Sequence, residues 1–291
     1  MKNGENSIKQ TLDSIVAQDY PHEELELVFV DDGSEDNTLS IIKEFVATHD
    51  ISSKVFHTSW KGLGHARNMI AANASGDYIL WVDGDMILER GYVQKQVDFL
   101  KDHPGIGVAK GVQALEPAAN LLATLEMYSR AVGKMIDFTN AKTRPMALGT
   151  GGAIYRIGAL KEAGGFDENL RGYGEDLDIE LRLRSLNYLL STNEAKYFDY
   201  ERLGLTWHSL WRRYWRRGYC SHYFYHKHRG LFKSYKNSVF ASFLLGLFHA
   251  RKLFKLTGKK AFFFLPFVYG FRSVAWNGGF IESHLKSYEP N

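Results

Sequence analysis

Two acidic clusters in the 291-residue sequence have the chemistry of a metal and phosphate site. Asp83-Gly-Asp85 places two carboxylates one residue apart, and Asp31-Asp32 places two side by side. Carboxylate oxygens are ligands that Mg²⁺ and Mn²⁺ prefer, and both ions keep positions open for substrate phosphates. A solvated turn that caps the next helix is the alternative for a lone Asp-Gly-Asp. A third acidic cluster, Glu175-Asp176, favours the metal interpretation. Turns that only face solvent have no reason to be acidic at several places in one chain.

The elements that would position these clusters alternate between strands and helices. Leu25–Val30 runs into Asp31 and Tyr78–Val82 runs into Asp83. Both runs are almost wholly apolar, which is typical of buried parallel strands. Helical spacing of apolar residues follows or precedes them in residues 6–17, 38–47, 64–74 and 92–101. This alternation predicts an α/β fold with a mostly parallel sheet flanked by helices, whose ligands bind beyond the carboxyl ends of the strands.

Two glycine-rich segments lie further along the chain. Gly149–Tyr155 indicates a glycine turn that leads into a strand, where a sugar could approach the backbone closely. A plain tight turn is the alternative. Gly172–Asp178 opens a predicted helix that extends to Leu186 and has carboxylates in its first turn, where the helix dipole favours them.

Seven short motifs follow one another along the first two thirds of the chain. They are Gln18-Asp-Tyr-Pro21, Asp31-Asp-Gly-Ser34, Ala66-Arg-Asn68, Gly76-Asp-Tyr-Ile79, Asp83-Gly-Asp85, Gly164-Gly-Phe-Asp167 and Gly174-Glu-Asp176. Each motif alone is weak, but seven in one order are specific. The series resembles the family 2 glycosyltransferases, which have the Rossmann-like GT-A fold.

The resemblance implies a nucleotide-sugar donor, a divalent Mg²⁺ or Mn²⁺ ion, and inversion at the anomeric carbon. Residue by residue, Asp31 and Asp32 would contact the base and ribose of the donor. Arg67 would steady the donor, with a simple surface charge as the alternative. Asp85 would bind the metal directly, and Asp83 would be oriented at the ribose or the metal.

The resemblance also implies a general base and a further metal ligand. Asp176 would take the proton of the acceptor hydroxyl, whose pKa lies far above 7, if Glu175 or Asp178 raises the pKa of Asp176. Capping of the helix N-terminus is the alternative for this residue. His208 would complete the metal shell through neutral imidazole, unless it only packs beside Trp207.

The charge of the chain is divided between its two parts. Residues 1–201 contain 20 Lys or Arg and 31 Asp or Glu, whereas residues 202–291 contain 16 and 2. We therefore predict a catalytic domain over residues 1–204 and a basic, helical extension over residues 205–291. Nucleic-acid binding is not expected, because the rest of the chain is acidic and lacks a recognition module.

The basic part interleaves cations with aromatic and apolar residues. Trp211–Gly218 has arginines that could hold a diphosphate or a phosphate-bearing acceptor, or could belong to a helix that covers the main domain. Val239–Phe248 and Ala261–Tyr269 are apolar runs too short to cross a bilayer. Their flanking cations predict helices that lie in the interface of an anionic membrane, and ordinary packing onto the core is the alternative.

The beginning of the chain departs from the family pattern. Family members usually have an apolar strand before the loop that Lys2–Glu5 resembles, so we expect the first strand of the sheet to be missing. No signal peptide or long apolar segment is evident, and the single Cys220 excludes a disulfide framework. The expected location is cytoplasmic, peripheral on the cytoplasmic face of the membrane.

The sequence thus predicts an inverting, metal-dependent glycosyltransferase that acts on a glycan or lipid-linked acceptor. One alternative is a non-catalytic GT-A relative that binds a glycan or lipid, which the missing strand favours. A nucleotidyltransferase is a further alternative, against which the Gly174-Glu-Asp176 and Gly164-Gly-Phe-Asp167 motifs argue.

Overall fold

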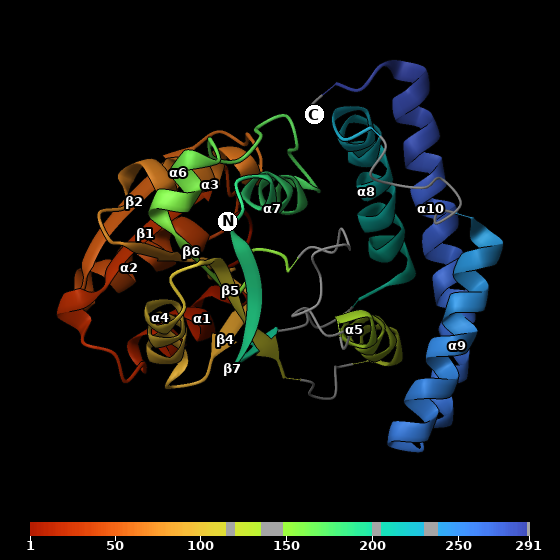
Figure 1. Cartoon of the computed structure of the whole chain (residues 1–291), viewed down its shortest axis with the longest axis horizontal. Helices are drawn as coiled ribbons and strands as arrows, with labels where there is room; N and C mark the ends of the chain where they lie inside the picture. The colour runs from red at the N-terminus through yellow and green to blue at the C-terminus, as the bar shows by residue number, and fades with distance from the viewer. Residues whose placement is uncertain (115–119, 135–147, 200–204, 230–237, 290–291) are drawn as a thin grey trace. The chain divides into compact units, whose positions relative to one another are not determined.

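The computed structural model describes residues 1–114, 120–134, 148–199, 205–229 and 238–289. Contacts between residues divide the chain into two compact units. Figure 1 labels the helices and strands of both and colours the chain by residue number. The first unit comprises Met1–Ala114, Phe138–Arg171 and Glu175–Tyr200. The second comprises Leu115–Asp137, Gly172–Gly174 and Glu201–Asn291, so it takes in segments that precede the predicted boundary after residue 204.

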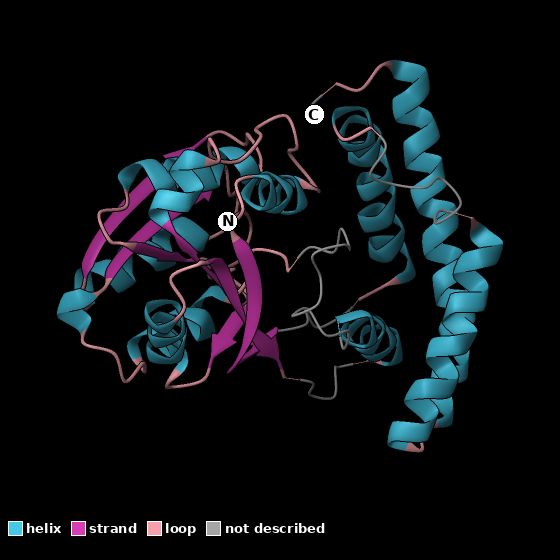
Figure 2. Cartoon of the chain, viewed as in Figure 1, coloured by secondary structure: helices cyan, strands magenta, loops and turns pink. Residues whose placement is uncertain are grey.

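The first unit alternates helices and strands, as Figure 2 shows by colour. Its helices are α1 (Ile8–Val16), α2 (Thr38–Thr48), α3 (Leu63–Asn73), α4 (Tyr92–Asp102), α6 (Ile157–Glu162) and α7 (Glu175–Ser185), with a 3₁₀ turn at His22–Glu24. Its strands are β1 (Glu26–Asp32), β2 (Ser52–Thr58), β3 (Tyr78–Leu80), β4 (Met86–Leu88), β5 (Ile106–Gln113), β6 (Ala153–Arg156) and β7 (Leu189–Asp199). The predicted α/β class, with a sheet flanked by helices, is confirmed.

The strands form two sheets of mixed direction. β1 and β2 pair in parallel, and the other five strands have the order β3-β6-β5-β7-β4. Among the described residues of the larger sheet, β5 and β7 pair in parallel, whereas β3–β6, β5–β6 and β4–β7 are antiparallel. The sheet is therefore less parallel than expected. After the glycine segment, β6 lies between β3 and β5 and runs in the direction opposite to both.

Alternating side chains bury both faces of the larger sheet. Val108 and Tyr155 belong to a core cluster with residues of α6 and α7, whereas the next residue of β5, Ala109, and the preceding residue of β6, Ile154, belong to a cluster with residues of α4. Successive side chains of a strand point to opposite faces, so each strand contributes to both clusters. Two apolar faces explain why these strands have so few polar residues.

The second unit is helical. It contains α5 (Leu121–Lys134), α8 (Trp207–Lys227), α9 (Val239–Thr257), a 3₁₀ turn (Lys260–Phe264) and α10 (Leu265–Lys286). Thr206 starts α8 with a capping box: its hydroxyl accepts from the Ser209 backbone N–H, and the Ser209 hydroxyl accepts from the Thr206 N–H. In the described ranges, no helix combines the length and apolarity needed to cross a bilayer.

Glycines allow the helices of the second unit to approach closely. A Cβ on Gly218 of α8 would overlap the carbonyl oxygen of Trp276, and a Cβ on Gly279 of α10 would overlap that of Trp215. Gly246 of α9 also lies close to α10, since a Cβ there would lie 2.7 Å from the Cα of Pro266. Backbone contact, rather than interlocking side chains, therefore sets the spacing of these helices.

We expect Gly279→Ala to destabilise the second unit by about 1–3 kcal/mol, because the new methyl group has backbone rather than a flexible side chain in its way. Gly278→Ala is the matched control: a Cβ there meets only Trp215 Cδ1 at 3.8 Å, an ordinary contact. The control should be neutral or slightly stabilising, since alanine favours helix more than glycine. Urea denaturation followed by circular dichroism measures both variants, and equal losses would contradict the close helix contact.

Candidate active site

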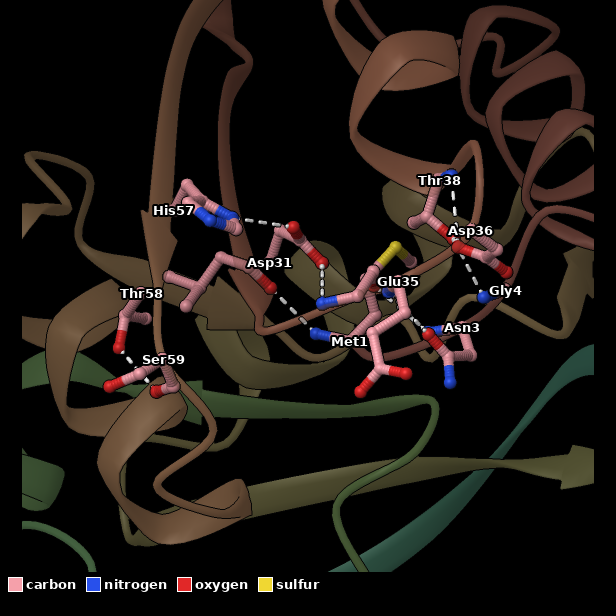
Figure 3. Close-up of polar contacts among 12 residues, drawn as sticks. Met1, Asn3, Gly4, Asp31, Glu35, Asp36, Thr38, His57, Thr58 and Ser59 are labelled. Carbon is pink, nitrogen blue, oxygen red and sulfur yellow. Dashed lines mark hydrogen bonds and ion pairs between the residues drawn. The ribbon is translucent and has the colours of Figure 1, made fainter.

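The carboxylate of Asp31, at the end of β1, is fully buried and has two partners. Its Oδ2 lies 2.8 Å from His57 Nδ1 of β2, and its Oδ1 accepts from the Ser34 backbone N–H at 3.2 Å. Figure 3 shows the contact between Asp31 and His57. Asp31 thereby ties β2 and the turn after β1 to the strand end, with one contact through each of its oxygens.

Asp32 holds the turn that starts α3. Its Oδ1 accepts from the Lys61 N–H and its Oδ2 from the Gly62 N–H, both at 2.8 Å. Gly62 has φ 96°, a left-handed conformation that glycine adopts without strain. Both predicted donor-contacting aspartates therefore also build the loops that surround the strand end.

The first residues of the chain lie over the turn that follows β1. The Met1 ammonium group donates to the Val30 carbonyl at 2.6 Å, and the Asp32 N–H donates to the Met1 carbonyl at 2.7 Å. Asn3 accepts from the Glu35 N–H through its side chain, at 2.9 Å. Figure 3 shows how closely Met1 and Asn3 approach this turn. The first residues of the chain therefore hold the turn in place through hydrogen bonds within the chain itself.

Asp83, in the turn after β3, is exposed and lies against a glycine. A Cβ on Gly151 would come within 2.5 Å of Asp83 Oδ2, so only glycine leaves room for this carboxylate. Asp85, two residues later, is half-buried and lies directly before β4. The turn thus presents two carboxylates near the glycine segment that leads into β6.

Arg67 of α3 is buried and forms an ion pair with Glu175 of α7, with 2.5 Å between Nη1 and Oε1. Burial opposes the charge of Arg67, but Glu175, Asp83 and Asp176 raise its pKa above the ordinary value. Burial, followed by the neighbouring Asp176, raises the pKa of Glu175 despite the ion pair. Arg67 therefore interacts with three carboxylates, one from the turn after β3 and two from the first turn of α7.

Asp176 lies in the first turn of α7 and is half-buried. Its Oδ1 accepts from the Leu177 N–H at 2.7 Å, and its Oδ2 would lie 3.4 Å from a Cβ on Gly149. Asp83 contacts the same segment two residues further on, at Gly151. The two carboxylates therefore lie against the same short loop. The sequence suggested that the two acidic clusters are neighbours, and the structure places one residue of each at this loop.

Glu180, one turn after Asp176, holds that loop in place and was not among the predicted site residues. Its oxygens accept from the Leu148 and Gly149 N–H groups, both at 2.9 Å, and its side chain is fully buried. Burial, and then the charge of Asp176, raise the pKa of Glu180 to about 7. A carboxyl group that titrates near neutrality beneath the loop couples the loop to pH.

Lys110 of β5 binds the other side of the same peptide groups. Its Nζ donates to the carbonyls of Leu148 and Gly149 at 2.9 and 3.1 Å. A buried lysine in an otherwise apolar strand was the available sequence signal for this role. Glu180 and Lys110 together fix both the donors and the acceptors of the loop backbone.

Three buried polar atoms near this site have no hydrogen-bond partner in the part of the chain that the structure describes. They are Trp81 Nε1, Tyr155 OH and Glu175 Oε2. Burial, and next Glu180 and Asp176, raise the pKa of Tyr155 well above its ordinary value, so its hydroxyl keeps its proton. Buried polar atoms of this kind are commonly satisfied by ordered water.

The predicted metal ligands come from both units. Asp83 and Asp85 lie in one turn of the first unit, and His208 is exposed in the first turn of α8, in the second unit. Among the described residues, no three His, Cys, Asp or Glu side chains form a ready-made metal site. Mg²⁺ and Mn²⁺ need less, because one or two carboxylates with waters and substrate phosphates complete their coordination. The Asp83-Asp85 turn fits that requirement.

Comparison with known sequences identifies the family. The model of Glycosyl transferase family 2 matches residues 1–161. The chain belongs to this family. The poly-beta-1,6-N-acetyl-D-glucosamine synthase of Staphylococcus epidermidis is 24% identical over 191 residues, which cover 64% of this chain and 44% of the synthase. The chain thus matches less than half the length of this curated relative.

Solved structures show the same fold for this family 2 chain. The mannosyltransferase PcManGT from Pyrobaculum calidifontis, in complex with GDP-Man and Mn²⁺, has a TM-score of 0.68 at 18% identity, covering 99% of this chain and 86% of its own. S. aureus TarS 1–349 in complex with UDP-GlcNAc has a TM-score of 0.55 at 18% identity, covering 99% and 90%. Both likenesses confirm the predicted GT-A fold.

We expect the stability gap between this family 2 protein and its Glu180→Gln variant to change with pH. The pKa of Glu180 rises from 4.5 to about 7 on folding, so the folded state binds the extra proton more tightly. Stability from this group is therefore complete below about pH 4.5 and is lost as the pH rises through about 7, by about 3 kcal/mol in total. Glutamine does not titrate.

Denaturation of both proteins at pH 5 and pH 8 tests this expectation. The wild type should lose stability relative to Glu180→Gln at the higher pH. Asp98→Asn on the exposed face of α4 is the control and should show no such trend. A gap that is the same at both pH values would contradict the burial of Glu180 beneath the loop.

We expect Arg67→Met to cost about 3–5 kcal/mol, because it leaves Glu175 charged and buried without its partner. The double variant Arg67→Met/Glu175→Gln removes both charges and should recover part of that loss. Thermal denaturation of the wild type, of Arg67→Met, of Glu175→Gln and of the double variant gives the coupling between the two sites. If the double variant is no more stable than the single one, the ion pair does not carry the energy assigned to it.

Proposed function

We propose that this protein is an inverting, metal-dependent glycosyltransferase. It would move a sugar from a nucleotide-diphosphate-sugar donor to a glycan or lipid-linked acceptor. Membership of family 2 supports the reaction class. The synthase named above makes a β-linked N-acetylglucosamine polymer by name, and the two structures similar to this chain hold GDP-Man and UDP-GlcNAc. The sugar, the nucleotide and the acceptor of this chain are not specified by those names.

The observation that carries the proposal is the loop Gly149–Gly151 between two carboxylates. Asp83 lies against one end of the loop and Asp176 against the other, while Arg67 interacts with both charges. A sugar-phosphate bond placed above these glycines would have a carboxylate on either side. Glycines without side chains let a substrate come close to the backbone there.

Asp176 is the proposed general base. It is half-buried, so it can reach both the solvent and a bound acceptor, and its Oδ1 accepts from the neighbouring Leu177 N–H. An acceptor hydroxyl must lose its proton as the new glycosidic bond forms, and a positioned carboxylate can take it. Asp178 cannot share this task, because it is fully buried in an ion pair with Arg182, with 2.6 Å between Oδ2 and Nη2.

The proposed metal ligands are Asp85, with Asp83 at the ribose or the metal, and His208 as a further ligand from α8. A bound Mg²⁺ or Mn²⁺ ion would neutralise the negative charge of the leaving diphosphate. Arg67 adds a fixed positive charge beside the same turn, and its ion pair with Glu175 holds the guanidinium in place. The chain therefore offers both a metal-binding turn and a permanent cation for the donor.

Asp31 and Asp32 are proposed to define the place of the base and ribose. Their oxygens already hold His57, Ser34 and the turn at Gly62. Each carboxylate oxygen can accept more than one hydrogen bond, so a ribose hydroxyl could still bind. The first effect of these residues is to shape the loops that would surround the nucleotide.

Asp176→Asn should lower kcat by about 10²–10⁴-fold while donor binding is retained, because the amide cannot take a proton. The assay is release of nucleoside diphosphate from a panel of UDP- and GDP-sugars with Mn²⁺ or Mg²⁺ and candidate acceptors. Asp98→Asn provides the same change at an exposed position and should leave turnover unaltered.

Other outcomes select other functions. Donor binding without turnover, unaffected by Asp176→Asn, would identify a non-catalytic binding module. Products that retain the nucleotide would identify a nucleotidyltransferase. Activity that survives both Asp85→Asn and a chelator would overturn the metal dependence.

A further inference from the structure

The second unit exposes several large aromatic side chains on α9, on α10 and in the turn between them. Six phenylalanines, each at least 36% exposed, form what we term the phenylalanine face; they are Phe240, Phe243, Phe248, Phe263, Phe264 and Phe267. Phe240 is 72% exposed and Phe248 64%. Single exposed apolar residues are ordinary, but a contiguous set marks an interaction surface.

Ring contacts connect the face across two helices. Phe243 of α9 and Phe267 of α10 meet edge to face, with ring centroids 5.8 Å apart. Phe263, in the turn between the two helices, lies 5.2 Å from Phe254 of α9. Along α10 the apolar exposure continues at Val274 and Ile281, which follow Phe267 at intervals of seven residues and so share its side of the helix.

The interior of the same unit combines an apolar core cluster with several buried polar groups. Glu126 of α5 is fully buried, and its Oε2 lies 2.7 Å from Arg272 Nη1 while its Oε1 accepts from Tyr214 at 2.9 Å. His222 and Ser283 are buried as well, and glycines make the closest helix contacts. This interior is complete without the phenylalanine face, whose rings remain outside the core cluster.

Cations border the phenylalanine face. On α9 the exposed stripe of Phe240, Leu244 and Phe248 continues on the same side as Arg251 and Lys255. The helix is thus apolar at one end and basic at the other. The only acidic residue from Val239 to Lys286 is Glu282, which pairs with Lys286 at 2.8 Å. An apolar surface bordered by cations complements a bilayer with anionic headgroups.

We propose that the phenylalanine face docks into the surface of an anionic bilayer, with the phenylalanines in the acyl region and the lysines and arginines at the headgroups. The helices lie in the interface and do not cross it, in agreement with the lack of a spanning helix among the described residues. Anionic lipids line the cytoplasmic leaflet, so the cytoplasmic face is the proposed location. A second copy of the chain fits less well, because facing basic surfaces repel one another.

Vesicle flotation of the whole protein, without donor or acceptor, tests the proposal independently of the transfer reaction. The protein should float with mixed phosphatidylcholine–phosphatidylserine vesicles and much less with phosphatidylcholine alone. The variant Phe240→Ser/Phe248→Ser/Phe267→Ser should bind more than about tenfold more weakly, since one buried phenylalanine is worth at least that factor. Leu189→Ser, at an exposed apolar residue of the first unit, is the control.

A charge variant separates the electrostatic part. Arg251→Glu/Lys255→Glu should lose at least about fivefold per residue on phosphatidylserine vesicles, and high salt should reproduce the loss. Lys43→Glu/Lys101→Glu makes the same change on exposed helix positions of the first unit and should have little effect. No flotation, or equal flotation of the serine variant, would overturn the proposal. So would a serine variant that turns a dimer into a monomer while the wild type ignores vesicles.

Discussion

One buried arrangement positions the rest of the site: Glu180 and Lys110 hold the same two peptide groups from opposite sides. The Glu180 carboxylate accepts hydrogen bonds from the N–H groups of Leu148 and Gly149, and the Lys110 ammonium group donates to their carbonyls. Four hydrogen bonds to two successive residues restrict the backbone conformation of the loop. They thereby also fix the position of the glycines that follow. Asp83 and Asp176 come from segments that are far apart in the chain, and each lies against a different glycine of this loop. A charged hydrogen-bond network of this kind is stable only when each member is present, which makes the loop sensitive to remote changes.

The sequence predicted the helices and the first strands well, because their signals are local. The apolar runs before Asp31 and Asp83 and the helical spacing around Thr38–Thr48 depend on neighbouring residues alone. The directions of β4, β6 and β7 were not predictable in this way, since pairing depends on contacts between distant segments. The family and the fold followed from the order of seven motifs rather than from any single residue.

The sequence pointed to the ionisable residues of the candidate site but not to the residues that hold its loop in place. Asp176 and Arg67 carry visible charges in recognisable motifs. Glu180 looked like one more helix carboxylate, and only the structure shows that it is fully buried beneath Gly149. Its role depends on burial, which a local pattern cannot reveal when the surrounding helix has polar residues on several sides. The same limit applied to Asp31 and Asp32, whose charges suggested ligand contact while their oxygens also organise loops.

The loops around the end of β1 are joined by bonds from Asp31, Asp32 and the first residues of the chain. Ordering a flexible loop when a ligand arrives subtracts from affinity. Here the hydrogen bonds already order the loops in the folded chain, so a nucleotide bound as proposed would lose less affinity in this way. Because the loops share these hydrogen bonds, a substitution that reshapes one loop would disturb its neighbours. Evolution of donor choice in this chain would then proceed through coordinated exchanges rather than through isolated ones.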